Sequence, residues 1–269
     1  MTIKLCASFL SALIFLGTSI SFAEERIEKN ILVGMVSGLA LVMDVHYPEE
    51  PNGYGIIHIS GSGWSRLLSY DAQQLSESQV GIFGAPLVEQ GYTVFSLNHR
   101  AVPRFQFPDP LVDVQRAVRF VRHNASEYGI DPQRIGAVGG SSGGHLVSLL
   151  AALDGEGNLD DPDPINRESA KIQTVVARAA PFDLTKMGHS ANLSLLMGAR
   201  LVNDPNSQEA KRYVDASPIT YISNDDPPML LIHGDEDQVV PYEQSVSFLS
   251  KLDEYAIPAK LITIPGAGH

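Results

Sequence analysis

The amino-acid sequence predicts an α/β fold: a mostly parallel, doubly wound sheet with helices on both of its faces. Three observations lead to this prediction. Short apolar runs alternate with amphipathic stretches, which is the pattern of successive strand–helix–strand units. The chain has 269 residues, a length that suits one large α/β domain. No internal repeat or low-complexity linker interrupts it, so we expect a single domain.

Seven short apolar runs are the expected strands. The first is expected at an edge of the sheet, and the other six in its parallel part. The expected strands cover residues 41–47, 55–59, 93–97, 134–138, 174–179, 229–233 and 260–264.

Three stretches with helical periodicity are the expected helices, over residues 110–127, 143–153 and 242–255. In the first, apolar residues recur at three- and four-residue steps with arginines off that stripe, and Asp109 is expected to cap its start. Residues 183–222 break the alternation of strands and helices. Because such an excursion in a doubly wound sheet lies over the carboxyl ends of the strands, we expect a small cap there.

The N-terminus has the pattern of a secretory signal peptide. Lys4 precedes an apolar run over residues 5–16, and the small residues Ser21 and Ala23 stand three and one places before Glu24. The run is shorter than the roughly 20 apolar residues that a membrane span needs. We therefore expect cleavage after Ala23.

Cleavage there divides the sequence into a signal peptide, residues 1–23, and a folded domain, residues 24–269, with 183–222 as a cap-like insertion. The mature protein would be secreted or periplasmic and would keep no stable membrane anchor. Cys6, the only cysteine, would leave with the signal peptide, so we expect no disulfide and no thiol chemistry.

The charge balance bears on the class of partner. The chain carries a formal net charge of −12 and has no cluster of Lys and Arg that could neutralise phosphates. Nucleic acid is therefore not an expected partner.

One motif in the sequence indicates a catalytic residue. The expected strand 134–138 is followed by Gly139-Gly140-Ser141-Ser142-Gly143-Gly144-His145 and then by a helix-forming stretch. This is G-x-S-x-G between a strand and a helix, the setting in which an α/β-hydrolase holds its nucleophilic serine on a sharp turn. The serine hydroxyl then stands at a helix N-terminus, where the helix dipole and free N–H groups favour negative charge.

The frame of this motif is ambiguous by one residue, since Ser142 also stands at the centre of a G-x-S-x-G pattern. We favour Ser141, because that frame places Gly143 two residues beyond the nucleophile and Gly144 where strand and helix pack tightly. It also makes Ser142 the donor of a backbone N–H to the oxyanion. Without its strand–helix setting, the motif would be no more than a glycine-rich turn.

A nucleophilic serine needs a base, and in α/β-hydrolases the histidine follows the serine and the acid along the chain. His189, His233 and His269 meet that order. His189 lies in the expected cap, and His233 ends a strand, where burial as a structural residue is the simpler interpretation. His269 follows the strand 260–264 on a glycine-containing turn, and we predict that it is the base.

The orienting acid is expected after the strand 229–233. Asp237 is our choice, because it lies deepest in the turn that precedes Pro241. Asp235 is a neighbouring alternative, and Asp183 is a more remote one.

The oxyanion hole is expected to draw on the loop that follows an early strand. That loop is Ser60-Gly61-Ser62-Gly63-Trp64, whose small residues let the backbone turn its N–H groups toward the ester oxygen. We assign Gly61 and Ser62, together with Ser142, to the hole. A plain Gly/Ser turn is the alternative for the loop alone.

From about residue 55 to 269, the sequence resembles α/β-hydrolase esterases related to hormone-sensitive lipase, especially the acetylxylan and feruloyl esterase-like (BD-FAE-like) branch. The resemblance implies an α/β-hydrolase fold, a Ser–Asp–His triad, and no metal or organic cofactor. The matching segments are Ser60-Gly61-Ser62-Gly63-Trp64, Asn98-His99-Arg100, residues 129–135, the turn around Ser141, Ser217-Pro218-Ile219, residues 227–235 and Gly266-Ala267-Gly268-His269.

The sequence departs from the family pattern at two places. The usual His-Gly-Gly-Gly-Trp is Ser60-Gly61-Ser62-Gly63-Trp64 here, so a side chain that braces the loop is replaced and oxyanion stabilisation is expected to be weaker. Relatives continue through a C-terminal helix after the histidine, whereas this sequence ends at His269, so the expected fold lacks that helix.

Together these observations predict a serine carboxylic ester hydrolase that acts through an acyl-enzyme on a small-molecule or carbohydrate-linked ester. Two alternatives stay open. One is an amidase or peptidase on the same fold, and the other is a catalytically weak binding protein. The sequence does not specify the acyl group, the alcohol or the oligomeric state.

Overall fold

The computed structural model describes residues 26–36, 38–65, 75, 80–188 and 190–269. The predicted signal peptide, residues 1–23, and the candidate His189 lie outside the described residues. Within the described ranges, no helix combines the length and apolarity needed to cross a bilayer.

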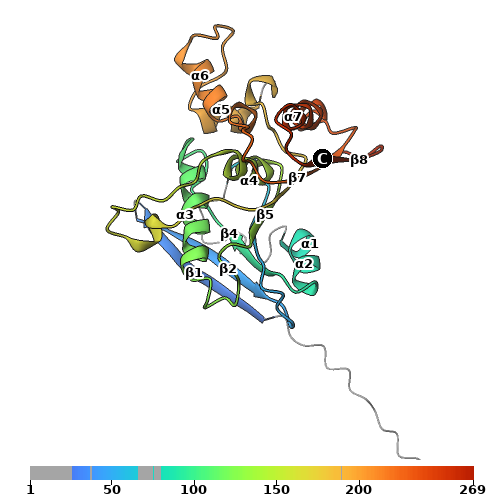
Figure 1. The fold of residues 1–269 in the computed structure, drawn as a ribbon. Helices are drawn as coiled ribbons and strands as arrows, with labels where there is room; N and C mark the ends of the chain where they lie inside the picture. Colours follow the sequence, from blue (N-terminus) through green and yellow to red (C-terminus); the bar gives the residue numbers. More distant parts are fainter. Residues whose placement is uncertain (1–25, 37, 66–74, 76–79, 189) are drawn as a thin grey trace, which may run out of the picture.

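An eight-stranded sheet forms the centre of the molecule, with the strand order β1-β2-β4-β3-β5-β6-β7-β8 (Figure 1). β2 pairs antiparallel with both β1 and β4, and every other neighbouring pair is parallel. The mostly parallel sheet predicted from the sequence is therefore confirmed. The strands are β1 (Arg26–Val36), β2 (Leu39–Tyr47), β3 (Gly55–Ile59), β4 (Thr93–Leu97), β5 (Ile135–Gly140), β6 (Val175–Arg178), β7 (Met229–Gly234) and β8 (Ala259–Ile264).

The outermost strand corrects one expectation. The predicted edge strand, residues 41–47, lies within β2, but β1 pairs outside it and forms the edge. Only one residue of β1, Val33, is buried. Most of β1 stays in contact with water, and even its apolar second half, residues 31–36, exposes Leu32 and Met35.

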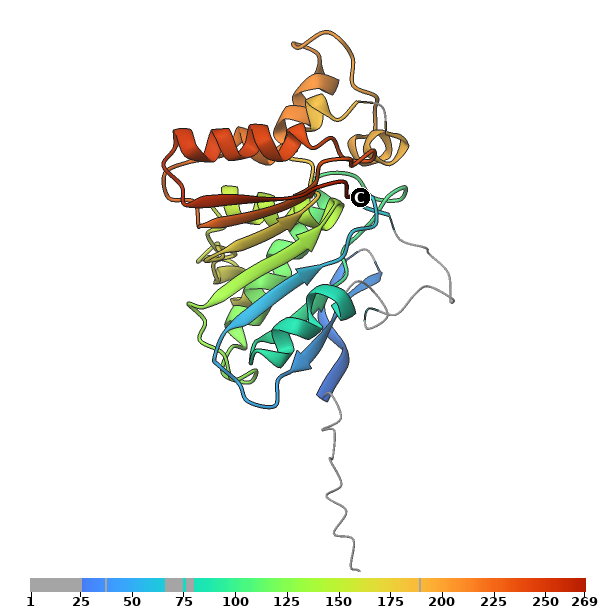
Figure 2. The same ribbon diagram turned by 90° about the vertical axis from the view of Figure 1, so that its right-hand side faces the viewer.

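Helices cover both faces of the sheet, as predicted. Side chains of α3 (Asp109–His123), α4 (Ser142–Ala152) and α7 (Glu243–Glu254) share one large apolar cluster with one face of β3 to β7. On the opposite face, α1 (Val80–Phe83) and α2 (Ala85–Glu89) pack on a smaller cluster. Figure 2 shows α1 and α2 in front of the strands and α3 behind them.

The start and end of α3 differ from the prediction. Asp109 is the first residue of the helix rather than its cap, and its carboxylate binds the guanidinium of Arg100 at 2.7 Å. The helix ends at His123, before the predicted limit at residue 127, because the side chain of Asn124 donates to the carbonyl of Phe120. Asn124 caps the helix, because its backbone N–H and its side-chain amide both donate to that carbonyl.

The segment over residues 183–222 holds four short helices. Ser190 caps α5 and Ser207 caps α6 through their hydroxyls. Figures 1 and 2 show α5 and α6 standing together at one end of the molecule. The helices are η3 (Leu184–Lys186), α5 (Ala191–Met197), α6 (Gln208–Asp215) and η4 (Pro218–Thr220), and a further short helix, η2 (Pro164–Arg167), precedes β6.

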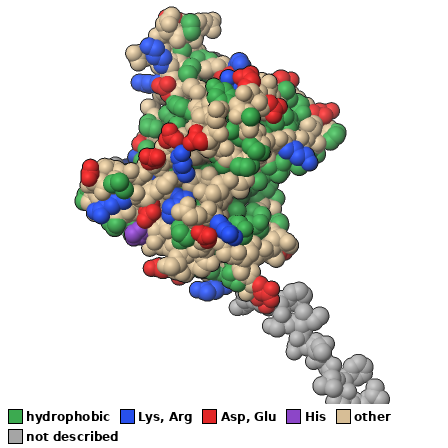
Figure 3. Space-filling view, viewed as in Figure 1, with side chains coloured by type: hydrophobic (Ala, Val, Ile, Leu, Met, Phe, Trp, Pro, Cys, Tyr) green, Lys and Arg blue, Asp and Glu red, His purple; other side chains and the backbone are tan. Residues whose placement is uncertain are grey.

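On the face drawn in Figure 3, Lys and Arg side chains are interspersed with Asp and Glu rather than gathered in one patch. Such a surface neutralises its own charges locally.

Candidate active site

A strained turn joins β5 to α4 at Ser141. The backbone of Ser141 has φ of 52° and ψ of −124°, in a region that residues with side chains rarely adopt. Two backbone hydrogen bonds hold it there: its N–H donates to the carbonyl of Arg178 at 2.8 Å, and its carbonyl accepts the N–H of His145 at 3.0 Å. The turn is therefore fixed from both the neighbouring strand and the following helix.

Glycines allow this turn to pack against its surroundings. A Cβ atom on Gly143 would lie 2.1 Å from the carbonyl oxygen of Ile59, and one on Gly144 would lie 2.7 Å from the Cβ of Ala180. Any side chain at these positions would push β3 or β6 away from α4. The glycines that the motif requires thus have a packing reason in this chain.

The two serines of the motif occupy different environments. The strained backbone falls on Ser141, which is half-buried and lines a cleft. Ser142 is the first residue of α4 and is buried, with 1% of its surface exposed. This geometry favours the frame centred on Ser141.

Asp237, in the loop after β7, is a buried carboxylate with every oxygen engaged. Its Oδ1 accepts the backbone N–H groups of Val239 at 2.8 Å and Val240 at 3.0 Å. Its Oδ2 lies 2.7 Å from Nδ1 of His269 and 3.2 Å from Nε2 of His233. Burial raises the pKa of Asp237, but the hydrogen bonds from His269, Val240 and Val239 outweigh it and hold the pKa below its ordinary value.

His269 follows β8 and reaches back to Asp237. Because a carboxylate only accepts, Nδ1 of His269 carries a proton, and in the neutral imidazole Nε2 then has the lone pair. The backbone carbonyl of His269 accepts a hydrogen bond from Nη1 of Arg178 at 2.8 Å, and Asp235 accepts the N–H of Gly266 at 2.6 Å. The loop that carries the imidazole is therefore held at both ends.

The other two candidate acids, Asp235 and Asp183, have different hydrogen-bond partners. Asp235 is exposed and binds the backbone of the histidine loop instead of the imidazole. Asp183 caps η3, accepting from Thr185, and pairs with Lys186 at 3.1 Å. The structure thus brings Asp237, and neither alternative, into contact with His269.

His233 contacts the carboxylate of Asp237 from the buried side. Its side chain is fully buried, and its Nδ1 lies 2.7 Å from the hydroxyl of Ser245. Both partners of Nε2, Asp237 and the carbonyl of Val240, are acceptors, so Nε2 carries the proton and Nδ1 accepts from Ser245. Burial lowers the pKa of His233, against the hydrogen bond to Val240 and the charge of Asp237. A neutral imidazole is the form that fits this site.

The loop after β3 packs directly on the turn at Ser141. A Cβ on Gly61 would lie 3.0 Å from the Cβ of Ser141. The backbone N–H of Ser62 donates to the hydroxyl of Ser142 at 2.9 Å. This differs from the expectation that Ser62 offers its backbone N–H to an oxyanion, because the Ser142 side chain reaches that N–H first. The N–H of Ser142 itself stands in the first turn of α4, where a helix offers no acceptor.

A second buried histidine, which sequence reasoning did not single out, ties this loop to α4. The indole N–H of Trp64 donates to Nδ1 of His145 at 3.1 Å, and Nε2 of His145 lies 2.7 Å from the carbonyl of Ala216. Burial lowers the pKa of His145 to about 4, against the hydrogen bond to Ala216. The one signal in the sequence was its position directly after the glycines of the motif.

These residues surround a cleft of about 370 Å³ that opens beside Ser141. Its wall combines polar groups with apolar side chains, and part of it comes from residues 183–222, which places that segment beside the end of β5. The lining residues are Gly61, Ser62, Gly63, Trp64, Ser141, Arg178, Pro181, Met187, Ser190, Asn192, Val239, Val240 and His269.

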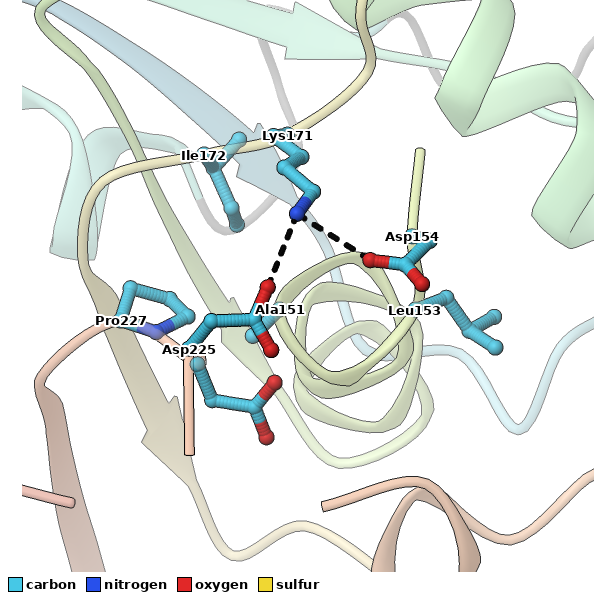
Figure 4. Close-up of a pocket in the computed structure, with 8 residues that line it drawn as sticks. Ala151, Leu153, Asp154, Lys171, Ile172, Asp225 and Pro227 are labelled. Atoms are coloured by element: carbon cyan, nitrogen blue, oxygen red, sulfur yellow. Dashed lines mark hydrogen bonds and ion pairs between the residues drawn. The ribbon is translucent and has the colours of Figure 1, made fainter. Parts of the chain in front are cut away.

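A second hollow, of about 30 Å³, lies where the end of α4 meets the segments before β6 and β7 (Figure 4). Lys171 is its central group and binds Asp154 at 3.1 Å and Asp225 at 3.0 Å. Lys171 thus pairs with two of the three acids that line this hollow, and the third, Asp226, accepts from Ser223. Across the described residues, no three His, Cys, Asp or Glu side chains are grouped as metal ligands would be.

Comparison with known proteins places this geometry in a family. A family model described as BD-FAE matches residues 43–252. The esterase LipQ of Mycobacterium tuberculosis is 36% identical over 68% of this chain and 44% of its own length. The probable carboxylic ester hydrolase LipM of the same organism is 34% identical over 62% of this chain and 38% of its own length. The chain therefore spans about two fifths of the length of these curated relatives.

A solved structure of similar size shows the same fold. A truncated carbohydrate esterase from gut microbiota superposes with a TM-score of 0.77 and is 31% identical, covering 91% of this chain and 89% of that one. The predicted α/β-hydrolase fold is confirmed by this likeness, and the predicted resemblance to esterases is confirmed by the family match.

Proposed function

Since this chain belongs to the BD-FAE family of α/β-hydrolase esterases, we propose that it is a carboxylic ester hydrolase with Ser141 as its nucleophile. One observation carries the proposal. Ser141 stands on a strained turn and opens on the same cleft as His269, whose Nδ1 contacts Asp237 at 2.7 Å. Nucleophile, base and orienting acid are the three groups that acyl transfer by a serine needs.

In the first half of the reaction, the Ser141 hydroxyl attacks the ester carbonyl and Nε2 of His269 takes its proton. Asp237 keeps the imidazole in the Nδ1–H tautomer and stabilises the imidazolium that forms. The carbonyl oxygen becomes an oxyanion, which Gly61, Ser62 and Ser142 border in this proposal. His269 then returns the proton to the departing alcohol, and the acyl group stays on Ser141.

In the second half, water attacks the acyl-enzyme and His269 removes its proton. The carboxylic acid leaves and the Ser141 hydroxyl is restored. The low pKa of Asp237 supports this role, because the acid stays ionised while the histidine gains and loses a proton.

The size and lining of the cleft support short-chain or carbohydrate-linked esters as substrates. A cleft of about 370 Å³ is at the small end of ligand pockets, and its wall offers the hydroxyl of Ser190 and the amide of Asn192. The likeness to a carbohydrate esterase is in line with this class. The signal-peptide pattern of residues 1–23 supports a secreted or periplasmic location.

Hydrolysis of 4-nitrophenyl acetate by the purified protein tests the proposal. We expect turnover by the natural sequence, loss of it in Ser141→Ala, and one-to-one labelling of Ser141 by a fluorophosphonate. Undiminished turnover in Ser141→Ala would reject the assignment. Comparing an ester with the amide of the same acyl group separates an esterase from an amidase.

A further inference from the structure

Among the described residues, the side-chain hydroxyl of Ser62 is the one polar group of this residue that has no hydrogen-bond partner. Its N–H donates to Ser142, and its carbonyl accepts both the N–H and the hydroxyl of Ser65. By contrast, its Oγ is closed off from solvent and has no hydrogen-bond partner in the described part of the chain.

Such a group is costly in a folded protein. A hydroxyl removed from water loses its hydrogen bonds to solvent, and native structures nearly always replace them. An exception that lines a functional cleft calls for an explanation in terms of a ligand. Ser62 lines the cleft beside Ser141, so a group that arrives in this cleft could complete the missing bond.

The position of Ser62 indicates which group that is. Gly61, the preceding residue, lies against the Cβ of Ser141, and Ser62 itself contacts Ser142 at the start of α4. The carbonyl oxygen of an ester under attack by Ser141 must therefore lie next to this loop. Its Oγ is closed off in the conformation described, and rotation about the Cα–Cβ bond of Ser62 would bring it to that oxygen as charge develops.

We propose that Ser62 stabilises the oxyanion with its side-chain hydroxyl, in place of the backbone N–H that Ser142 occupies. This inference rests on the proposed esterase function. As the bond from Ser141 Oγ to the carbonyl carbon forms, the electron pair of the C=O double bond moves onto oxygen, and the Ser62 O–H donates a hydrogen bond to it. Ser62 keeps its proton throughout and forms no covalent bond.

Ser142 is then a positioning residue as well as a backbone donor. Its hydroxyl holds the N–H of Ser62 at 2.9 Å and so fixes the loop with the Ser62 side chain beside the cleft. The two serines act as a pair. The Ser142 hydroxyl accepts the backbone N–H of Ser62, and the Ser62 hydroxyl takes the place of that N–H as a donor to the oxyanion.

Steady-state kinetics on four variants of the full chain test the pair: Ser62→Ala, Ser142→Ala, the double variant, and Ser250→Ala as a matched serine-to-alanine change on the exposed surface of α7. We expect Ser62→Ala to lower kcat by about 10²-fold with KM nearly unchanged, because one oxyanion donor is lost. The double variant should recover at least about 10-fold of that loss, since removing the Ser142 hydroxyl releases the N–H of residue 62.

The rate of fluorophosphonate labelling gives a second measure, because the phosphoryl oxygen occupies the same hole. We expect it to fall with kcat in Ser62→Ala while the final labelling stays one-to-one. If Ser62→Ala lowers the melting temperature, Ser62→Thr, which keeps the hydroxyl, decides: activity near that of the natural sequence supports the proposal and its loss overturns it.

Two results would overturn the proposal. One is a kcat for Ser62→Ala within about two-fold of the natural sequence. The other is equal loss in Ser62→Ala and Ser142→Ala with no recovery in the double variant, which would make the Ser142 hydroxyl the donor. A natural sequence that hydrolyses no ester would instead reject the proposed function, so the two failures are distinguishable.

Discussion

Nε2 of His233 lies 3.2 Å from Oδ2 of Asp237, the same oxygen that Nδ1 of His269 contacts at 2.7 Å. One carboxylate oxygen thus serves two imidazoles, one buried and one facing the cleft. Because both partners of His233 Nε2 are acceptors, that nitrogen carries the proton and the buried imidazole shares its N–H between Asp237 and Val240. His233 is in this sense a support for the acid.

Replacing His233 should therefore displace the carboxylate of Asp237 while leaving that residue in the chain. We expect His233→Ala to lower kcat by about 10- to 100-fold with little change in KM, because a displaced carboxylate no longer aligns His269. The loss of a donor should also raise the pKa of Asp237, so activity should disappear at a higher pH as the solution is acidified. The pH profile of kcat/KM distinguishes this role from simple loss of packing, which would leave its acid limb in place.

Substituting Asp237 and Asp235 one at a time tests which of the two aspartates orients His269. Asp237→Asn should lower kcat by about 10⁴-fold, because the amide favours the wrong imidazole tautomer. Asp235→Asn is the matched control: its side-chain oxygen can still accept the N–H of Gly266, and we expect kcat within about three-fold of the natural sequence. A larger loss in Asp235→Asn than in Asp237→Asn would reassign the acid.

His145 should make the folded state sensitive to acid. Its pKa of about 4 lies below the ordinary value of 6.5, so as pH falls the unfolded chain binds a proton before the folded protein does. Its stabilising contribution is complete above pH 6.5 and is lost progressively toward pH 4, by about 3 kcal/mol.

Urea unfolding at a series of pH values measures this dependence. His145→Asn should be less stable at neutral pH, because the bonds from Trp64 and to Ala216 are broken, yet it should lose less stability on acidification. His123→Gln, at a partly exposed histidine on α3, should keep the steep dependence. An unchanged slope in His145→Asn would contradict the assignment.

Gly143 is the position in the turn that tolerates an added side chain least. Because a Cβ there would lie 2.1 Å from the carbonyl of Ile59, Gly143→Ala should destabilise the protein by about 3 kcal/mol or more and abolish activity. At Gly34, on β1, the nearest atom to a Cβ is Arg116 Nε at 3.8 Å, so Gly34→Ala should unfold at nearly the urea concentration of the natural sequence. Similar midpoints for the two variants would show that the turn can relax.

The parallel core of the sheet could be predicted from the sequence because its signal is local. Every residue of β3 and β4 is buried, and apolar residues outnumber polar ones in each strand. The turn at Ser141 could equally be predicted, since two glycines stand on each side of the Ser141-Ser142 pair. β1 was not predicted although residues 31–36 are apolar, because most of its residues remain exposed and its place at the edge depends on its pairing with β2.

Within the candidate site, the contact between Asp237 and His269 agrees with the order expected along the chain, while the roles given to Ser141 and the oxyanion loop remain predictions. The bond between Ser62 and Ser142 could not be foreseen, because it joins residues 80 positions apart through one side-chain rotamer. The same applies to His145, whose two side-chain partners come from two separate segments. Such contacts depend on how whole elements meet.

Trp64 is the only tryptophan of the chain, and it stands in the loop beside Ser141 with its indole bound to His145. Indole emission from this protein therefore comes from one place, the wall of the cleft. In the proposed mechanism, stopped-flow fluorescence would follow ester arrival, acyl-enzyme build-up and release without any attached dye. Because a protonated imidazole quenches a neighbouring indole, the same emission would also serve as an optical titration of His145.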